Sequence, residues 1–147
     1  MNVQDSKTSD EAKIRDLIDQ RVNALYAKDA EAVLSALTTD FVAFSLAPPL
    51  ISTMTDAKAY EAWFATWRGP IGTAVRHLTI AVSGDLGVSH SLNLMTGTAA
   101  GGHEVELWYR QTLSFRKIDG AWKIAHEHNS VPFYMDGSFR TAIDLKP

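Results

Sequence analysis

The stretch EVELWYRQTLSFRKIDGAWKIAHEHNSVP, residues 104–132, decides the fold, because it predicts two long strands joined by a tight turn. Its first half alternates between apolar and polar residues, which is typical of a half-buried strand. The apolar positions are Val105, Leu107, Tyr109, Leu113 and Phe115, with Gln111 as the one polar residue among them. Asp119-Gly120 is the expected turn, because a two-residue hairpin loop needs positive φ at its centre.

A two-residue loop at Asp119-Gly120 fixes which residues face each other on the two strands. The predicted pairs are Ile118 with Ala121, Phe115 with Ile124, Leu113 with His126, Gln111 with His128 and Tyr109 with Ser130. Since opposed residues share a face, we expect an inner face that is apolar at the turn and polar at its far end. A three-residue loop with a bulge would exchange the faces and bring Glu127 and Asn129 inside.

The composition is that of an ordinary globular chain. At 147 residues, with 46% hydrophobic and 21% charged residues, it is long enough to bury the core of one domain. The net charge is -3 and the basic residues are scattered, so we expect neither nucleic acid nor a membrane as partner. The chain has no cysteine, which excludes disulfides and thiolate metal sites. Its polar N-terminus and lack of a long apolar run predict a cytoplasmic protein.

The N-terminal half predicts three helices. After a loose tail over residues 1–7, the capping-box spacing of Thr8 and Glu11 starts a long amphipathic helix that runs to residue 28. Asp29 caps a short second helix, and a strand follows over residues 41–46.

Thr55 or Asp56 starts the third helix, which carries an aromatic stripe. The stripe consists of Tyr60, Trp63, Phe64 and Trp67. It is typical of a helix that packs on a sheet, and Tyr60, Trp63 and Trp67 become ligand-binding candidates if this helix roofs a cavity.

The second half predicts further strands at residues 75–82 and 86–98, with a turn at Gly101-Gly102. A two-residue loop there pairs Leu92 with Gln111 and His90 with Leu113, so a row of His90, Leu113 and His126 crosses three strands. Residues 133–147 show no periodicity, and we expect them to wrap the surface as a C-terminal tail.

This order of elements predicts an α+β architecture, in which helices cover one face of a curved antiparallel sheet. The other face carries too many large residues to be wholly solvated. We therefore expect a homodimer through that outer face, with Trp108, Arg110 and Glu127 at the interface.

Several short motifs give the chain a resemblance to a known family. They are Ala27-Lys28-Asp29-Ala30, Asp40-Phe41-Val42, Pro48-Pro49-Leu50, Ser83-Gly84-Asp85 and, above all, Asp119-Gly120-x-Trp122-x-Ile124-x-His126-x-His128-x-Ser130-Val131-Pro132. The chain resembles the nuclear-transport-factor-2-like fold and, within it, the SnoaL-like and ketosteroid-isomerase-like proteins. The resemblance implies a single SnoaL-like domain over residues 8–132, commonly dimeric. It also implies a cone-shaped sheet, with three N-terminal-half helices on its concave face and a pocket between them.

The resemblance does not fix a reaction, because these folds host isomerases, cyclases, dehydratases and binding domains. A ketosteroid isomerase needs a carboxylate base and an oxyanion hole made of a tyrosine and a protonated aspartate. By position these roles fall near Ser45, Arg21 and Gln111, and none of the three residues matches. That activity is disfavoured, although Gln111 can still donate a hydrogen bond to a carbonyl.

The histidines are the remaining candidates, since imidazoles suit general acid-base work near neutrality. We hypothesise proton transfer on a small, largely apolar carbonyl compound, of the isomerase, cyclase or dehydratase type. His128 or His126 would be the base and Gln111 the carbonyl-polarising donor. Tyr109, Ser130 and His90 complete the predicted ligand contacts, and no cofactor is expected.

Other interpretations stay open. The histidines can be structural polar groups, or the pocket can hold an apolar metabolite without turning it over. His90, His126 and His128 can also hold a metal, although the predicted inner face offers no carboxylate to support them. SnoaL-like cyclases place an acid on the strand of Glu127, and a bulged turn would make Glu127 and Asn129 the pocket residues.

Overall fold

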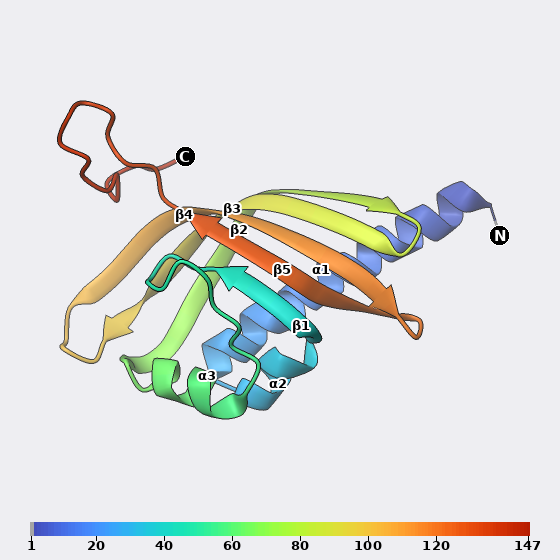
Figure 1. The fold of residues 1–147 in the computed structure, drawn as a ribbon, viewed down its shortest axis with the longest axis horizontal. Helices are drawn as coiled ribbons and strands as arrows, with labels where there is room; N and C mark the ends of the chain where they lie inside the picture. The colour runs from blue at the N-terminus through green and yellow to red at the C-terminus, as the bar shows by residue number, and fades with distance from the viewer. Residues whose placement is uncertain (1) are drawn as a thin grey trace.

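Three helices lie on one side of a curved five-stranded sheet, which confirms the predicted α+β architecture (Figure 1). The computed structural model describes residues 2–147. The helices are α1 (Val3–Ala27), α2 (Ala30–Ser35) and α3 (Ala57–Phe64). The strands are β1 (Leu37–Phe44), β2 (Trp67–Ser83), β3 (Leu86–Ala99), β4 (Glu104–Ile118) and β5 (Ala121–Ser130). Their order is β1-β5-β4-β3-β2, and neighbours are antiparallel except β1, which pairs parallel with β5.

The first helix is longer than predicted. It begins at Val3, so the expectation of a loose tail over residues 1–7 is wrong for the described part of that segment. The side chain of Asn2 caps the helix by accepting a hydrogen bond from the backbone N–H of Gln4. An asparagine is as good an N-cap as the predicted Thr8, and no breaker separates the two positions. Met1 lies outside the described residues.

The other two helices begin where the sequence predicted, with Asp29 and Asp56 as N-caps. The third helix is shorter than its aromatic spacing suggested. It ends at Phe64, and Trp67 is instead the first residue of β2, where it pairs with Ala99 of β3. Strand pairing therefore overrides the helical spacing of the last aromatic residue.

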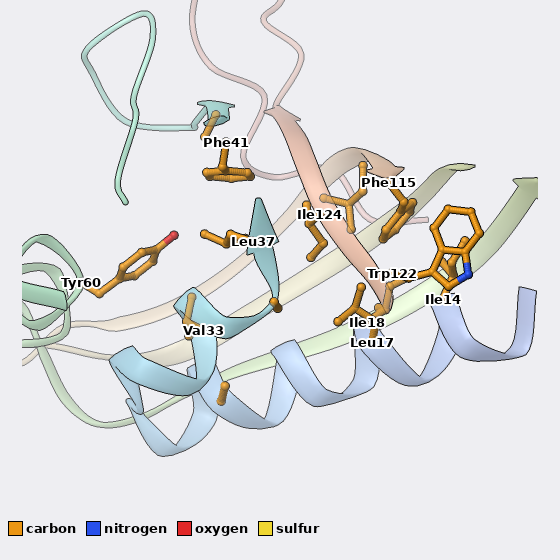
Figure 2. Packing of buried hydrophobic residues seen from close by; sticks show 14 of the residues in the cluster. Ile14, Leu17, Ile18, Val33, Leu37, Phe41, Tyr60, Phe115, Trp122 and Ile124 are labelled. Carbon is orange, nitrogen blue, oxygen red and sulfur yellow. The ribbon is translucent and has the colours of Figure 1, made fainter. Parts of the chain in front are cut away.

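The core lies between α1 and the inner face of the sheet (Figure 2). Ile14 on α1 and Phe115 and Ile124 on β4 and β5 are at most 1% exposed. Leu17 and Ile18 continue the buried stripe of α1, as its periodicity predicted. This end of the sheet is thus filled by apolar side chains.

The turn between β4 and β5 forms as predicted, but the register changes beyond it. Ile118 faces Ala121 and Phe115 faces Ile124. Ala125 is then an extra residue in β5, because Ser114 pairs with His126. Such a β-bulge moves every later side chain to the opposite face.

Three predicted pairs are therefore wrong. Leu113 faces Glu127 instead of His126, Gln111 faces Asn129 instead of His128, and Ser130 faces Arg110 instead of Tyr109. The alternative register, in which Glu127 and Asn129 lie inside, is therefore the one observed. The bulge that produces it lies within β5 and not at the turn.

The turn between β3 and β4 also differs from the prediction by one residue. Thr98 pairs with Glu104, and the N–H of Ala99 donates to the carbonyl of His103, so the loop has three residues in place of two. Gln111 consequently faces Ser91, not Leu92. The expected row of His90, Leu113 and His126 does not form. The buried inner positions of β3 are Ser89, Ser91 and Asn93.

A buried acid ties the N-terminal part of α1 to the β4–β5 hairpin. Asp10 accepts hydrogen bonds from the indole N–H of Trp122 at 3.0 Å and from the ammonium of Lys117 at 3.1 Å. The hydrogen bond from Trp122, together with Lys117, lowers the pKa of Asp10 below its ordinary value against the opposing effect of burial. The ionised carboxylate thus stabilises the folded state.

We expect Asp10→Ala to destabilise the protein by about 1–3 kcal/mol, because the buried N–H of Trp122 loses its acceptor. Asp16→Ala, which removes an exposed acid from the same helix, is the matched control. Urea denaturation at neutral pH measures both. Since the folded pKa of Asp10 is lowered, its contribution is present above the unfolded pKa and fades as pH falls through the folded one. A penalty that grows on acidification would contradict this account.

Candidate functional site

The bulge at Ala125 places a carboxylate at the centre of the inner face. Glu127 is only 7% exposed and forms an ion pair with Arg21 of α1, with 2.7 Å between Oε2 and Nη2. Its Oε1 accepts hydrogen bonds from Nε2 of Gln111 and from Nδ2 of Asn129, each at 3.0 Å. One buried carboxylate thus joins α1 to two strands.

The hydrogen bonds continue across the sheet. Gln111 Nε2 also donates to Asn129 Oδ1 at 3.0 Å, and Gln111 Oε1 accepts from Asn93 Nδ2 at 3.1 Å. Asn93 in turn contacts the hydroxyl of Tyr109 at 3.4 Å and accepts from Ser91 at 2.8 Å. We call this set the inner polar network. It comprises Arg21, Ser91, Asn93, Tyr109, Gln111, Glu127 and Asn129.

The charges of the network stabilise each other. Burial raises the pKa of Glu127, but the charge and hydrogen bond of Arg21 and the hydrogen bond of Asn129 outweigh it, and the net pKa lies below its ordinary value. Burial likewise lowers the pKa of Arg21, and Glu127 more than compensates. Both groups are therefore charged at neutral pH.

Two tyrosines lie close to this ion pair. Burial raises the pKa of Tyr109, and burial also raises the pKa of Tyr60 on α3. Both phenols are consequently neutral at physiological pH. The site thus combines an ionised carboxylate with neutral hydroxyl groups. Groups of these two kinds can accept and donate protons in general acid-base catalysis.

A pocket of about 530 Å³ opens beside the network. Asn129 and Ser130 supply polar atoms to its wall, and apolar side chains such as Leu107, Phe133 and Ile143 supply most of the rest. The parallel strands β1 and β5 end side by side, next to the C-terminal segment (Figure 1). Beneath α1, a chamber of about 40 Å³ lies against the network itself.

Three of the predicted site residues lie at this site. Gln111 and Tyr109 are buried members of the network, at 8% and 9% exposure. Ser130 lines the pocket and accepts a hydrogen bond from Nε of Arg110 at 3.0 Å.

The predicted histidines lie on the outer face. His126 donates from Nδ1 to the carbonyl of Val42 at 2.7 Å, and its ring packs edge-on against Phe44. His128 also contacts Phe44 and is exposed, while the exposed His90 faces Thr112. The adjacency of His128 and Gln111, on which the proposed histidine base depended, is therefore wrong.

The aromatic candidates of α3 belong to the core or pack against it. Tyr60 is 5% exposed. Trp63 and Trp67 are half-buried, with ring centroids 6.4 Å apart. Their predicted role in ligand binding stays a prediction.

Five network residues were missing from the predicted site: Arg21, Ser91, Asn93, Glu127 and Asn129. Arg21 carried a usable signal, because it lies four residues after Leu17 on the buried stripe of α1. A charged residue at such a position needs a buried partner. Glu127, predicted for the outer interface with Trp108 and Arg110, is that partner and lies inside.

Two structural observations concern metals and membranes. Within residues 2–147, no three His, Asp or Glu side chains cluster closely enough to hold a metal ion. None of the described helices is long and apolar enough to cross a membrane.

We expect Glu127→Gln to destabilise the protein by about 3–5 kcal/mol, because it leaves the charge of Arg21 buried without a counter-charge. The double substitution Arg21→Met with Glu127→Gln removes both charges and should be less destabilised than Glu127→Gln alone. Glu106→Gln, at an exposed carboxylate on β4, is the control. Urea denaturation at neutral pH compares them, and equal stability of Glu127→Gln and the double variant would contradict the ion-pair account.

The sequence and the fold are similar to those of known proteins. An NTF2-like protein of unknown function from Pseudomonas putida KT2440 is 28% identical, with a TM-score of 0.83 over 95% of this chain and 98% of that one. A "putative scytalone dehydratase" from Novosphingobium aromaticivorans DSM 12444 is 18% identical, with a TM-score of 0.80 over 95% of each chain. The association domain of CaMKII from C. elegans is 16% identical, with a TM-score of 0.68 over 86% of this chain and 98% of that one.

The last two likenesses show the fold alone. No curated protein sequence matches the chain. The model of the SnoaL-like domain family matches residues 14–134, which confirms the resemblance that the motifs of the final hairpin predicted. The chain therefore belongs to the SnoaL-like domain family, with the nuclear-transport-factor-2-like fold.

Proposed function

We propose that this protein is an acid-base enzyme of the isomerase or dehydratase type, acting on a small, largely apolar carbonyl compound. One observation carries the proposal: the buried carboxylate of Glu127 is hydrogen-bonded to Asn129, which lines a mostly apolar pocket of about 530 Å³. A pocket of this size and character suits a small molecule. The likeness of the fold to a protein described as a scytalone dehydratase supports the dehydratase type.

Hydrogen-bond capacity indicates where a ligand carbonyl would bind. Both N–H groups of the Gln111 amide are used, by Glu127 and Asn129. Asn129 donates one N–H to Glu127 and keeps the second for a ligand. The hydroxyl of Ser130 accepts from the outward-facing Arg110, so its side chain lies on the opposite face of β5 from that of Asn129. In this proposal Asn129 holds the carbonyl oxygen, and Gln111 positions Glu127 and Asn129.

Glu127 is the proposed base. It is ionised at neutral pH, and its Oε1 accepts a hydrogen bond from Asn129, which lines the pocket. A proton next to the ligand carbonyl is transferred to Oε1. It then returns to another carbon in an isomerisation, or leaves with a hydroxyl group as water in a dehydration.

Hydrogen–deuterium exchange at carbon tests the proposed base on a panel of model compounds. Small cyclic enones, ketones and β-hydroxyketones are incubated with the protein in D2O, and ¹H NMR follows the loss of the signals next to the carbonyl. We expect exchange with the wild type and a decrease of about 100-fold or more in Glu127→Gln. Arg21→Met with Glu127→Gln, which buries no unpaired charge, should be equally inactive. Circular dichroism verifies that each variant is folded.

His128→Ala is the control for the histidine hypothesis, since His128 is exposed on the outer face. The proposal expects this variant to exchange at the wild-type rate. Loss of exchange in His128→Ala together with full exchange in Glu127→Gln would overturn the proposal in favour of a histidine base.

A second function, binding without catalysis, is favoured by the lowered pKa of Glu127. A carboxylate that Arg21 holds in its ionised form is a weak base. Such a protein would show ligand-dependent chemical-shift changes at Asn129 and Ser130 without any exchange in D2O.

We further propose a homodimer through the outer face of the sheet, where Trp108 and Arg110 lie. Phe44 and Val88 on the same face are 38% and 43% exposed, which is more apolar surface than solvation requires. The likeness of the fold to an association domain is consistent with self-association. Sedimentation velocity should show a dimer that Trp108→Lys converts to a monomer, and a monomeric wild type at every concentration would contradict this.

A further inference from the structure

The segment after β5 forms a closed loop beside the pocket. The N–H of Ala142 donates to the carbonyl of Pro132, and the N–H of Tyr134 donates to the carbonyl of Arg140, each at 2.8 Å. We call residues 132–142, which these bonds close, the C-terminal loop. It projects from the end of β5 (Figure 1). Through Phe133, Phe139 and Thr141, the loop forms part of the pocket wall.

Phe139 in the C-terminal loop has a strained backbone. Its φ is +54°, in the left-handed region that glycine adopts freely and that is an outlier for a bulky residue. Hydrogen bonds fix both of its neighbours. Asp136 accepts from the N–H and the hydroxyl of Ser138, and the N–H of Arg140 donates to the hydroxyl oxygen of Ser138 at 3.3 Å. The loop thus imposes on Phe139 a conformation that glycine would adopt at lower cost.

Burial of the ring does not offset this strain. Phe139 is 71% exposed, and its ring contacts that of Phe133 with 5.6 Å between the centroids. Phe133 is itself 48% exposed. A phenylalanine that served only the stability of the loop would bury most of its ring. Residues held in unfavourable backbone conformations cluster at ligand sites, and Phe139 lines the pocket.

The pocket combines one free amide with several uncovered apolar side chains. Asn129 supplies the amide, which keeps one N–H for a ligand. Phe133, Phe139 and Ile143 supply apolar surface, and Ile143 is 63% exposed. Single exposed apolar residues are normal on a protein surface, but a group of them around one cavity marks a binding site.

Resting on the proposed function, we propose that Phe139 is a specificity-determining residue, which contacts an apolar ring that the substrate carries away from its carbonyl group. Asn129 holds the carbonyl oxygen and Phe139 contacts the ring. The pocket therefore selects carbonyl compounds that have such a ring over bare ketones. Burial of about 60 Å² of apolar surface corresponds to about tenfold in affinity, and the exposed ring of Phe139 can supply such an area.

Phe139→Gly and Phe139→Ala separate the backbone strain from the ring. Both remove the ring, but only glycine relieves the left-handed backbone. We expect the melting temperature of the glycine variant to exceed that of the alanine variant by about 2–4 °C, which reverses the usual order of these two residues. Differential scanning calorimetry measures both variants. An alanine variant at least as stable as the glycine variant would show that the position is unstrained and would overturn the inference.

Two model ketones test the selectivity of the pocket. NMR titrations follow the side-chain amide of Asn129 as cyclohexanone or 4-phenylcyclohexanone is added. We expect the wild type to bind 4-phenylcyclohexanone at least about tenfold more tightly than cyclohexanone. In Phe139→Gly this ratio should fall to about threefold or less, while the affinity for cyclohexanone changes by less than about twofold.

His77→Gly is the matched control. His77 also has a left-handed backbone, with φ at +53°, but it is exposed on β2 and does not line the pocket. Its replacement relieves the same kind of strain and should leave the ratio of the two affinities at the wild-type value.

Three binding results would overturn the role of Phe139: a ratio that stays about tenfold in Phe139→Gly, equal affinities of the wild type for the two ketones, or no change at Asn129 with either one. The exchange assay in D2O tests the proposed chemistry of Glu127 separately. Selective binding without exchange supports the role of Phe139 and overturns only the catalytic proposal. Exchange that Glu127→Gln abolishes, with a ratio that Phe139→Gly does not change, does the reverse.

Discussion

The buried ion pair between Arg21 and Glu127 is the constraint on which the interior depends. Two opposite charges can leave water only if good geometry and additional hydrogen bonds compensate their lost hydration. Here Gln111 and Asn129 supply those hydrogen bonds to the carboxylate, and Asn93 satisfies Gln111 in turn. The charge of Arg21 on α1 thereby requires one amide side chain on the inner face of each of three neighbouring strands, β3, β4 and β5.

The ion pair divides the space under α1 into an apolar and a polar half. Towards the β4–β5 turn, the buried side chains of Ile14, Phe115 and Ile124 fill the interior. Next to Leu113, the inner residues Gln111, Glu127 and Asn129 are polar, and the open pocket lies at this end. A cavity is tolerable there because polar side chains can exchange a protein partner for a ligand, whereas a void among the apolar residues would only lose contacts.

The sequence predicted the strands, the tight turn and the apolar pairs next to it, but it could not reveal the bulge. Ala125 is small and fits either face, and the residues after it alternate in a way that suits both registers. His126 and His128 form one set, and Glu127 and Asn129 form the other. Arg21 would have decided between them, because a charge on the buried stripe of α1 requires a carboxylate opposite it and the histidines cannot provide one. The three-residue loop after β3 was not predicted for a similar reason. Two adjacent glycines, Gly101 and Gly102, are compatible with turns of two residues and of three.

The same ion pair that keeps Glu127 ionised also weakens it as a base, and the network contains a way to relieve this. Each hydrogen bond to a carboxylate favours its ionised form and lowers its pKa. The hydrogen bond from Asn129 is one of the interactions that lower the pKa of Glu127. In the proposed reaction, a ligand carbonyl that draws the Asn129 amide towards the pocket weakens that hydrogen bond. In that proposed complex the pKa of Glu127 would rise when a carbon acid is bound, so the substrate itself would strengthen the base that acts on it.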